Sequence, residues 1–150
     1  MIADECLMPK NRSKIKLEEN GKSAIFLNPS LDAGLQAIKV DGCVEQKGTR
    51  ADFVIEYKNR AVVVELKGKD VEKAAKQVLE TANQWKHQLS RCDEVAGLIV
   101  AERFPKASSK VQIRQDEFRK KYLNPLHVVC CNEEYDFDAV FTFRPLKRRK

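Results

Sequence analysis

Residues 51–67 read ADFVIEYKNRAVVVELK, and this stretch holds two strand patterns separated by a short turn. Residues 51–57 alternate Phe, Ile and Tyr with Asp, Val and Glu, as expected for a strand with two distinct faces. Residues 60–67 contain three consecutive valines, a β-branched run typical of a buried strand. Asn59 of the intervening Lys58-Asn59 pair tolerates the positive φ of a tight turn. We therefore predict a β-hairpin with a two-residue turn.

The register of this hairpin brings two acidic side chains together. A turn at Lys58-Asn59 pairs Tyr57 with Arg60, and five residues further out it places Asp52 opposite Glu65. Directly paired residues lie about 5 Å apart and point to the same face. Lys67 follows Glu65 by two positions, so it belongs to that face as well. The opposite face of the hairpin is uniformly apolar.

Two carboxylates facing each other across a ladder repel, so this arrangement calls for a compensating charge. A divalent cation would supply it, because Mg²⁺ prefers oxygen ligands and is often held by one or two carboxylates with water and phosphate oxygens. The ammonium group of Lys67 could orient or deprotonate a water and stabilise the charge that develops on phosphorus oxygens. The pattern therefore indicates metal-assisted phosphodiester hydrolysis.

Asp52 followed by Glu65-Leu66-Lys67 and Gly68 resembles the motif of the PD-(D/E)XK nuclease superfamily. The resemblance implies that Asp52 and Glu65 bind Mg²⁺ or Mn²⁺, that the backbone carbonyl of Leu66 is a further ligand, and that Lys67 is the catalytic lysine. The usual core of the superfamily is a helix, three antiparallel strands, a second helix and a parallel strand, which fits residues 37–101.

Some branches of that superfamily also use a Gln from the following helix, and Gln77 in a Gln-x-x-x-Thr arrangement with Thr81 would match it. The alternative for Gln77 is an exposed position beside the apolar stripe. Ala51 replaces the Pro that usually precedes the first Asp. The acidic residue that the first helix often supplies has no single counterpart, and the candidates are Glu5, Glu18, Glu19, Asp32 and Asp41.

The rest of the chain alternates helix and strand patterns. Asp70 is a suitable N-cap, and an apolar stripe at three- and four-residue steps predicts a helix from there to about residues 90–92. Further patterns predict strands at 37–43, 95–101 and 126–131, a polar connection at 45–50, a helix at 111–122 and a last edge strand at 139–143. We interpret residues 1–143 as one α/β domain with a restriction-endonuclease-like core, a mixed central sheet flanked by helices, and residues 144–150 as a basic C-terminal tail.

The chain has 150 residues and a formal net charge of +6, which weakly favours a polyanionic partner. No apolar run reaches the roughly 20 residues of a membrane-spanning helix, and no secretory signal is apparent, so we expect a cytoplasmic protein without membrane association. Basic side chains that could contact nucleic acid lie in the tail and in the loop before the second helix: Lys106, Lys110, Arg144, Lys147, Arg148, Arg149 and Lys150. A solubilising tail is the alternative interpretation.

The five cysteines, Cys6, Cys43, Cys92, Cys130 and Cys131, are odd in number and form no Cys-x-x-Cys pair. We therefore expect reduced thiols in place of a disulfide framework or a zinc site.

Together these features predict a metal-dependent nuclease, with DNA favoured over RNA on superfamily prevalence alone. No separate sequence-reading domain is visible, so the enzyme would recognise DNA structure or act with a partner, as a homodimer or as a subunit of a larger complex. The alternative is a catalytically silent or partner-dependent module of the same fold that binds nucleic acid or protein.

Overall fold

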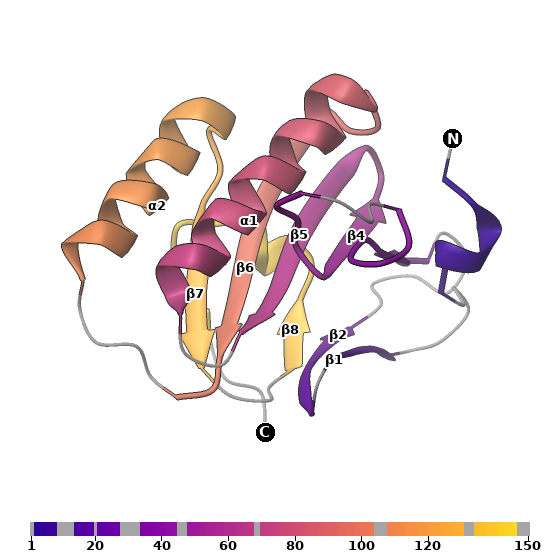
Figure 1. Ribbon diagram of the computed structural model, residues 1–150, viewed down its shortest axis with the longest axis horizontal. Coiled ribbons are helices and arrows are strands. Elements are labelled where there is room, and N and C mark those ends of the chain that lie inside the picture. The colour runs from indigo at the N-terminus through magenta and orange to yellow at the C-terminus, as the bar shows by residue number, and fades with distance from the viewer. Residues whose placement is uncertain are drawn as a thin grey trace.

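Two β-sheets and two α-helices form the protein in the computed structural model, which describes residues 2–8, 14–19, 21–27, 34–44, 48–67, 70–103, 108–130 and 134–146 (Figure 1). At Lys67 only the backbone is described. The larger sheet has five strands in the order β3-β4-β5-β6-β7, and the smaller has three in the order β1-β2-β8. The prediction of an α/β protein with a mixed central sheet is confirmed.

The larger sheet contains the predicted hairpin. Strands β3 (Gln36–Lys39), β4 (Phe53–Tyr57) and β5 (Arg60–Lys67) are antiparallel, whereas β6 (Glu94–Ala101) and β7 (Leu126–Cys130) run parallel to β5. Tyr57 pairs with Arg60, as the register predicted. Lys58 and Asn59 adopt φ values of 49° and 61°, the left-handed conformation that a two-residue turn of this hand requires.

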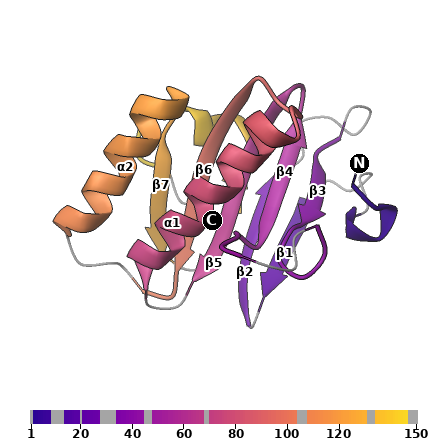
Figure 2. The same cartoon turned by 45° about the horizontal axis from the view of Figure 1, so that its top comes forward.

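Two helices cover one face of this sheet and lie side by side (Figures 1 and 2). Helix α1 (Val71–Asn83) begins at the predicted N-cap, where the Asp70 side chain accepts a hydrogen bond from the Lys73 N–H at 2.9 Å. It continues into a π-helical turn, η2 (Gln84–Gln88). Helix α2 (Ser109–Tyr122) begins after Ser108, whose side chain accepts from the Val111 N–H. Within the described residues, neither helix has the length and apolar character needed to cross a bilayer.

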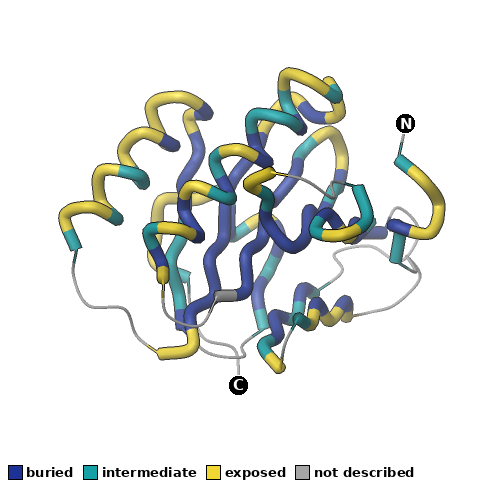
Figure 3. Tube along the Cα trace, viewed as in Figure 1, coloured by how far each residue is buried: buried dark blue, intermediate teal, exposed yellow. Residues whose placement is uncertain are grey.

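The smaller sheet covers the opposite face of the larger one. Strands β1 (Lys14–Glu19) and β2 (Lys22–Leu27) are antiparallel, and β8 (Glu134–Asp136) runs parallel to β2. The apolar face of this sheet packs on the face of the hairpin that carries Phe53. The other face of the hairpin is apolar too, and its Val54 and Val63 pack beneath α1. Both faces of the central strands are therefore buried, as the dark-blue core of Figure 3 shows.

The C-terminal part differs from the prediction. Residues 139–143 form no edge strand; a 3₁₀-helix, η3 (Asp138–Phe141), takes their place. Its backbone bonds are local, with the N–H of Val140 donating to the Phe137 carbonyl and the N–H of Thr142 donating to the Ala139 carbonyl. Phe137 and Val140 are buried. Apolar residues three apart therefore reflect one buried side of a helical turn and not strand alternation.

Residues 6–8 lie along the outer edge of the larger sheet. A short 3₁₀-helix, η1 (Asp4–Cys6), leads to Leu7, which forms an antiparallel bridge with Ile38, and the Met8 N–H donates to the Ala37 carbonyl at 2.9 Å. The predicted strand at 37–43 is shorter than expected. It ends at Lys39, and beyond it the carbonyl of Asp52 accepts from the N–H groups of both Val40 and Asp41, so the regular pairing with β4 stops.

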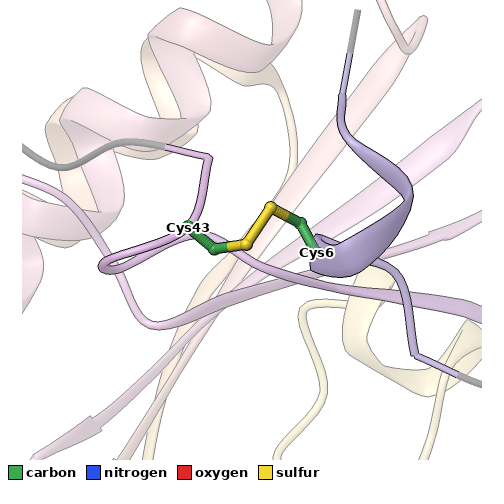
Figure 4. Close-up of a disulfide and its surroundings, with 2 residues drawn as sticks. All are labelled: Cys6 and Cys43. Carbon is green, nitrogen blue, oxygen red and sulfur yellow. A yellow bond between two sulfur atoms is a disulfide. The ribbon is translucent and has the colours of Figure 1, made fainter.

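A disulfide joins Cys6 to Cys43, with the Cα atoms 5.7 Å apart and the two residues separated by 37 positions in the sequence (Figure 4). Cys130 is also disulfide-bonded, whereas Cys92 is buried and free. The expectation of reduced thiols is therefore wrong for Cys6, Cys43 and Cys130. The number and spacing of cysteines do not reveal this pairing, because it depends on η1 lying beside the turn that follows β3.

Candidate active site

The predicted acidic pair lies at the end of β5, where this strand extends beyond its partner. The last β4–β5 pair is Phe53 with Val64, so Glu65, Leu66 and Lys67 continue past the start of β4. Asp52 fills the next position, and its Oδ2 accepts a hydrogen bond from the Leu66 N–H at 2.9 Å. Asp52 and Glu65 are only 6% and 2% exposed, and their carboxyl groups are in hydrogen-bonding contact. The structure therefore brings together the two acids that the register paired.

Burial raises the pKa of Asp52 above its ordinary value, and the charges of Glu19 and Asp41 raise it further. The hydrogen bonds from the Leu66 N–H and with Glu65 act in the opposite direction but do not cancel the rise. A hydrogen bond between two carboxyl groups requires a proton, since ionised carboxylates only accept. Burial is the dominant effect, so Asp52 holds its proton more strongly than an isolated carboxyl group would.

The Leu66 carbonyl is placed to join this pair. The N–H and C=O of one strand residue point toward the same neighbouring strand. Because the Leu66 N–H reaches Asp52, the Leu66 carbonyl also points to the Asp52 side of β5. Two carboxylates and a carbonyl are all oxygen donors, which suits Mg²⁺ or Mn²⁺ with water completing the shell. Among the described residues, no group of three or more His, Cys, Asp or Glu side chains could hold a metal ion.

Lys67 ends β5, and its backbone pairs with Ala101 of β6. Strand alternation assigns it to the face of Glu65, and its side chain lies outside the described part of the chain. The backbone of Glu65, Leu66 and Lys67 therefore lies at one end of the sheet, beside the end of β6.

Helix α1 contacts the segment that leads into Asp52. The Gln77 Nε2 donates to the Arg50 carbonyl at 3.0 Å, and the Ala51 N–H donates to the Thr81 Oγ1 at 2.8 Å. Gln77 is half-buried, and its Oε1 is buried without a hydrogen bond from any described residue. The predicted Gln-x-x-x-Thr arrangement thus faces residues 50–51, directly before the acidic pair.

Two further acids act on the site, and both were among the candidates for the first-helix acid. Glu19 is the last residue of β1, on the strand face that also carries the buried Leu17. Asp41 lies in the turn after β3 and pairs through its Oδ1 with the Nε of Arg50 at 2.6 Å. Of the other candidates, Glu5 and Glu18 are exposed, and Asp32 lies outside the described residues. Sequence patterns could not single out Glu19, because its proximity depends on how the smaller sheet packs.

The predicted nucleic-acid contacts are only partly described. Lys110 is exposed in the first turn of α2, and Arg144 is exposed after η3. Lys106, Lys147, Arg148, Arg149 and Lys150 lie outside the described residues. Leu146 packs against the core that the two sheets share.

A second polar cluster, missed by the sequence analysis, lies at the other end of β4. The Trp85 Nε1 donates to Glu56 at 2.7 Å, and Arg91 binds both oxygens of the same carboxylate. A cavity of about 240 Å³ opens between Arg91 and the β4–β5 turn. Asp52 directly precedes β4 and Glu56 lies near its other end, so the cluster is separate from the acidic pair.

No protein-family model, curated protein or solved structure was found to match the chain.

Proposed function

We propose that the chain is a metal-dependent nuclease that hydrolyses phosphodiester bonds in DNA, using Mg²⁺ or Mn²⁺ on a PD-(D/E)XK-like core. The observation that carries this proposal is the buried Asp52–Glu65 pair at the free end of β5. Burying two acids in contact is costly unless a positive charge compensates them, so their presence at a strand end favours a cation site.

The order of elements supports a restriction-endonuclease-like core. Three antiparallel strands, β3 to β5, are followed by α1 and the parallel strand β6. The departure is at the beginning, where the β1–β2 hairpin occupies the place of a first helix. Glu19 of this hairpin supplies an acid near Asp52, as the first helix does in the superfamily.

Each residue of the site has a distinct part in the proposed chemistry. Asp52 and Glu65 provide anionic oxygens, and the Leu66 carbonyl provides a neutral one, so that a divalent ion is held at the end of β5. When bound, the ion supplies Lewis-acid polarisation of the phosphate and lowers the pKa of water. Lys67 orients the attacking water and offsets the charge that develops on the phosphoryl oxygens. Glu19 adds negative potential that favours the cation.

The substrate class follows from charge. A net charge of +6 favours a polyanion. We assign the protein a nucleic-acid substrate recognised by its structure, such as a junction, flap or end, or a substrate presented by a partner. A homodimer would place one site on each strand of a duplex.

Cleavage of labelled nucleic acids tests the function. The panel contains single-stranded, duplex, flap and four-way-junction DNA together with RNA, each with Mg²⁺, Mn²⁺ or EDTA. Asp52→Asn keeps the shape of the side chain and serves as the matched control. Metal-dependent cutting that disappears in this variant supports the proposal, whereas cutting in EDTA or by Asp52→Asn contradicts it.

A second candidate is a silent or partner-dependent module of the same fold. It is favoured by the lack of a three-residue metal-binding group among the described residues. Calorimetric titration with Mn²⁺ separates a silent module from a nuclease that needs a partner. The silent module binds DNA without needing Mn²⁺ and shows no ion binding, whereas the partner-dependent nuclease still binds the ion at Asp52.

A further inference from the structure

Helix α1 holds the backbone that immediately precedes Asp52 through two side chains spaced one turn apart. Gln77 and Thr81 lie on the same side of the helix because residues four apart are neighbours. Gln77 donates to the carbonyl of Arg50, and Thr81 accepts from the N–H of Ala51. The peptide group between Arg50 and Ala51 is therefore bound at both its oxygen and its nitrogen by one helix.

This peptide has no strand partner. Strand β4 begins at Phe53, so the Arg50 carbonyl and the Ala51 N–H lie before the β-ladder. On the other side of Asp52, its own carbonyl accepts from the Val40 N–H at 2.9 Å. The backbone of Asp52 is thus fixed from two directions, by α1 and by the chain that follows β3.

Thr81 is an unusual choice for its position. It is 1% exposed and lies among apolar helix residues such as Val78 and Ala82. A buried hydroxyl is costly unless it is hydrogen-bonded, and Thr is a poor residue for a helix interior. Ala or Val would satisfy the packing alone. The hydroxyl accepts a hydrogen bond from the N–H of Ala51, the residue next to the proposed metal-binding acid, and this bond accounts for its presence.

We propose that Thr81 and Gln77 are positioning residues that set the direction of the Asp52 carboxylate through the Arg50–Ala51 peptide. With that peptide fixed, the Oδ2 of Asp52 reaches the Leu66 N–H, and the carboxyl group faces Glu65. The inference rests on the proposed function, since it assigns to α1 the alignment of the cation-binding oxygens. Groups that orient metal ligands from behind typically affect affinity by about 10- to 100-fold.

The test compares Thr81→Val, which removes the hydroxyl at nearly constant shape, with Thr81→Ser, which keeps it. Both are made in the full chain. The first readout is hydrogen exchange of the Leu66 amide in EDTA, because this amide is bonded to Asp52 Oδ2. The Val63 amide, in the middle of β5, reports global opening. We expect the Leu66-to-Val63 exchange ratio to rise about tenfold in Thr81→Val, and to stay near the wild-type ratio in Thr81→Ser.

The second readout is Mn²⁺ affinity, measured by calorimetry at a temperature where every variant is folded. Thr81→Val is expected to bind about 10- to 100-fold more weakly, and Thr81→Ser to restore the affinity. Gln77→Met, which removes the donor to Arg50, should change both readouts in the same direction. Trp85→Phe is the control for general destabilisation, because it removes the hydrogen bond to Glu56 at the other end of β4.

The outcomes separate the two proposals. If the wild-type protein binds no Mn²⁺, the nuclease function fails, but the exchange ratio still decides whether α1 positions Asp52. An unchanged ratio in Thr81→Val, or the same change in Trp85→Phe, overturns the positioning role. A raised ratio in Thr81→Val with recovery in Thr81→Ser supports it.

Discussion

The Oδ2 of Asp52 accepts a hydrogen bond from the backbone N–H of Leu66 at 2.9 Å, which links the start of one hairpin strand to the end of the other. The Asp52 carboxylate thereby replaces the backbone carbonyl that would accept from the Leu66 N–H if β4 and β5 were still paired here. The same bond holds one carboxylate oxygen against β5 and leaves the group in contact with Glu65. The acidic pair is therefore part of the hairpin's own structure, and changes there should affect stability as well as binding.

Asp52→Asn is expected to stabilise the metal-free protein at neutral pH by about 1 kcal/mol. Burial raises the pKa of Asp52 in the folded state above its unfolded value of 3.8. The folded state therefore binds this proton more tightly than the unfolded state, and the stability gained is complete below pH 3.8 and lost as pH rises through the raised pKa. Asn is neutral throughout. Urea unfolding in EDTA at pH 4 and pH 8 checks this, and a variant less stable than wild type at pH 8 would contradict it.

Mn²⁺ affinity is expected to rise with pH, since the ion must displace the proton that burial holds on Asp52. Glu19 raises the pKa of Asp52, so Glu19→Gln should move the midpoint of this dependence to lower pH. Glu18→Gln is the matched control, because Glu18 is exposed on the other face of β1. Calorimetry across pH 4–8 gives both midpoints. Equal midpoints for the two variants would show that Glu19 has no special relation to the site.

Lys67→Ala is expected to lower the cleavage rate by about 10²- to 10⁴-fold, while Mn²⁺ and DNA binding stay nearly unchanged. The reason is that Lys67 is assigned to the attacking water and not to the ion. Single-turnover cleavage and DNA binding in Ca²⁺ measure the two effects separately. Lys110→Ala, on the exposed first turn of α2, should show the reverse pattern of weaker binding with an intact chemical step. Substantial cleavage by Lys67→Ala would remove this residue from the mechanism.

Replacing Cys6 and Cys43 together with Ser is expected to lower the free energy of unfolding by about 2–4 kcal/mol, because the disulfide closes a loop of 37 positions. Cys92→Ser controls for the loss of a cysteine as such. Its thiol is not disulfide-bonded, and burial raises its pKa to about 11, so it stays protonated at neutral pH. Denaturant unfolding curves decide the matter, and equal stabilities for the double variant and wild type would rule out a stabilising crosslink.

Local rules were sufficient for the hairpin and for α1. A two-residue turn at Lys58-Asn59 leaves one register, and that register determines which residue faces Asp52. Asp70 and the apolar stripe likewise define where α1 begins. These features depend on neighbours in sequence, so the pattern contains the information needed to predict them.

The features that escaped prediction depend on distant partners. Strand β2 pairs with β8 through Ile25 and Glu134, more than a hundred positions apart, and no local pattern marks that pairing. The effect of Glu19 on Asp52 arises only when this smaller sheet packs on the larger one. The resemblance pointed to Gln77 and Thr81, but their contacts with Arg50 and Ala51 were not predictable, because a helix sequence does not say which loop its polar residues will meet.

Residues 6–8 have a consequence for how the protein avoids self-association. An uncovered edge strand can template pairing with another chain and so begin aggregation. Leu7 and Met8 occupy the outer edge of β3, and the Cys6–Cys43 bond fastens them there. The disulfide therefore also keeps the edge of β3 covered. Once it is reduced, the β3 backbone becomes available for strand exchange between molecules.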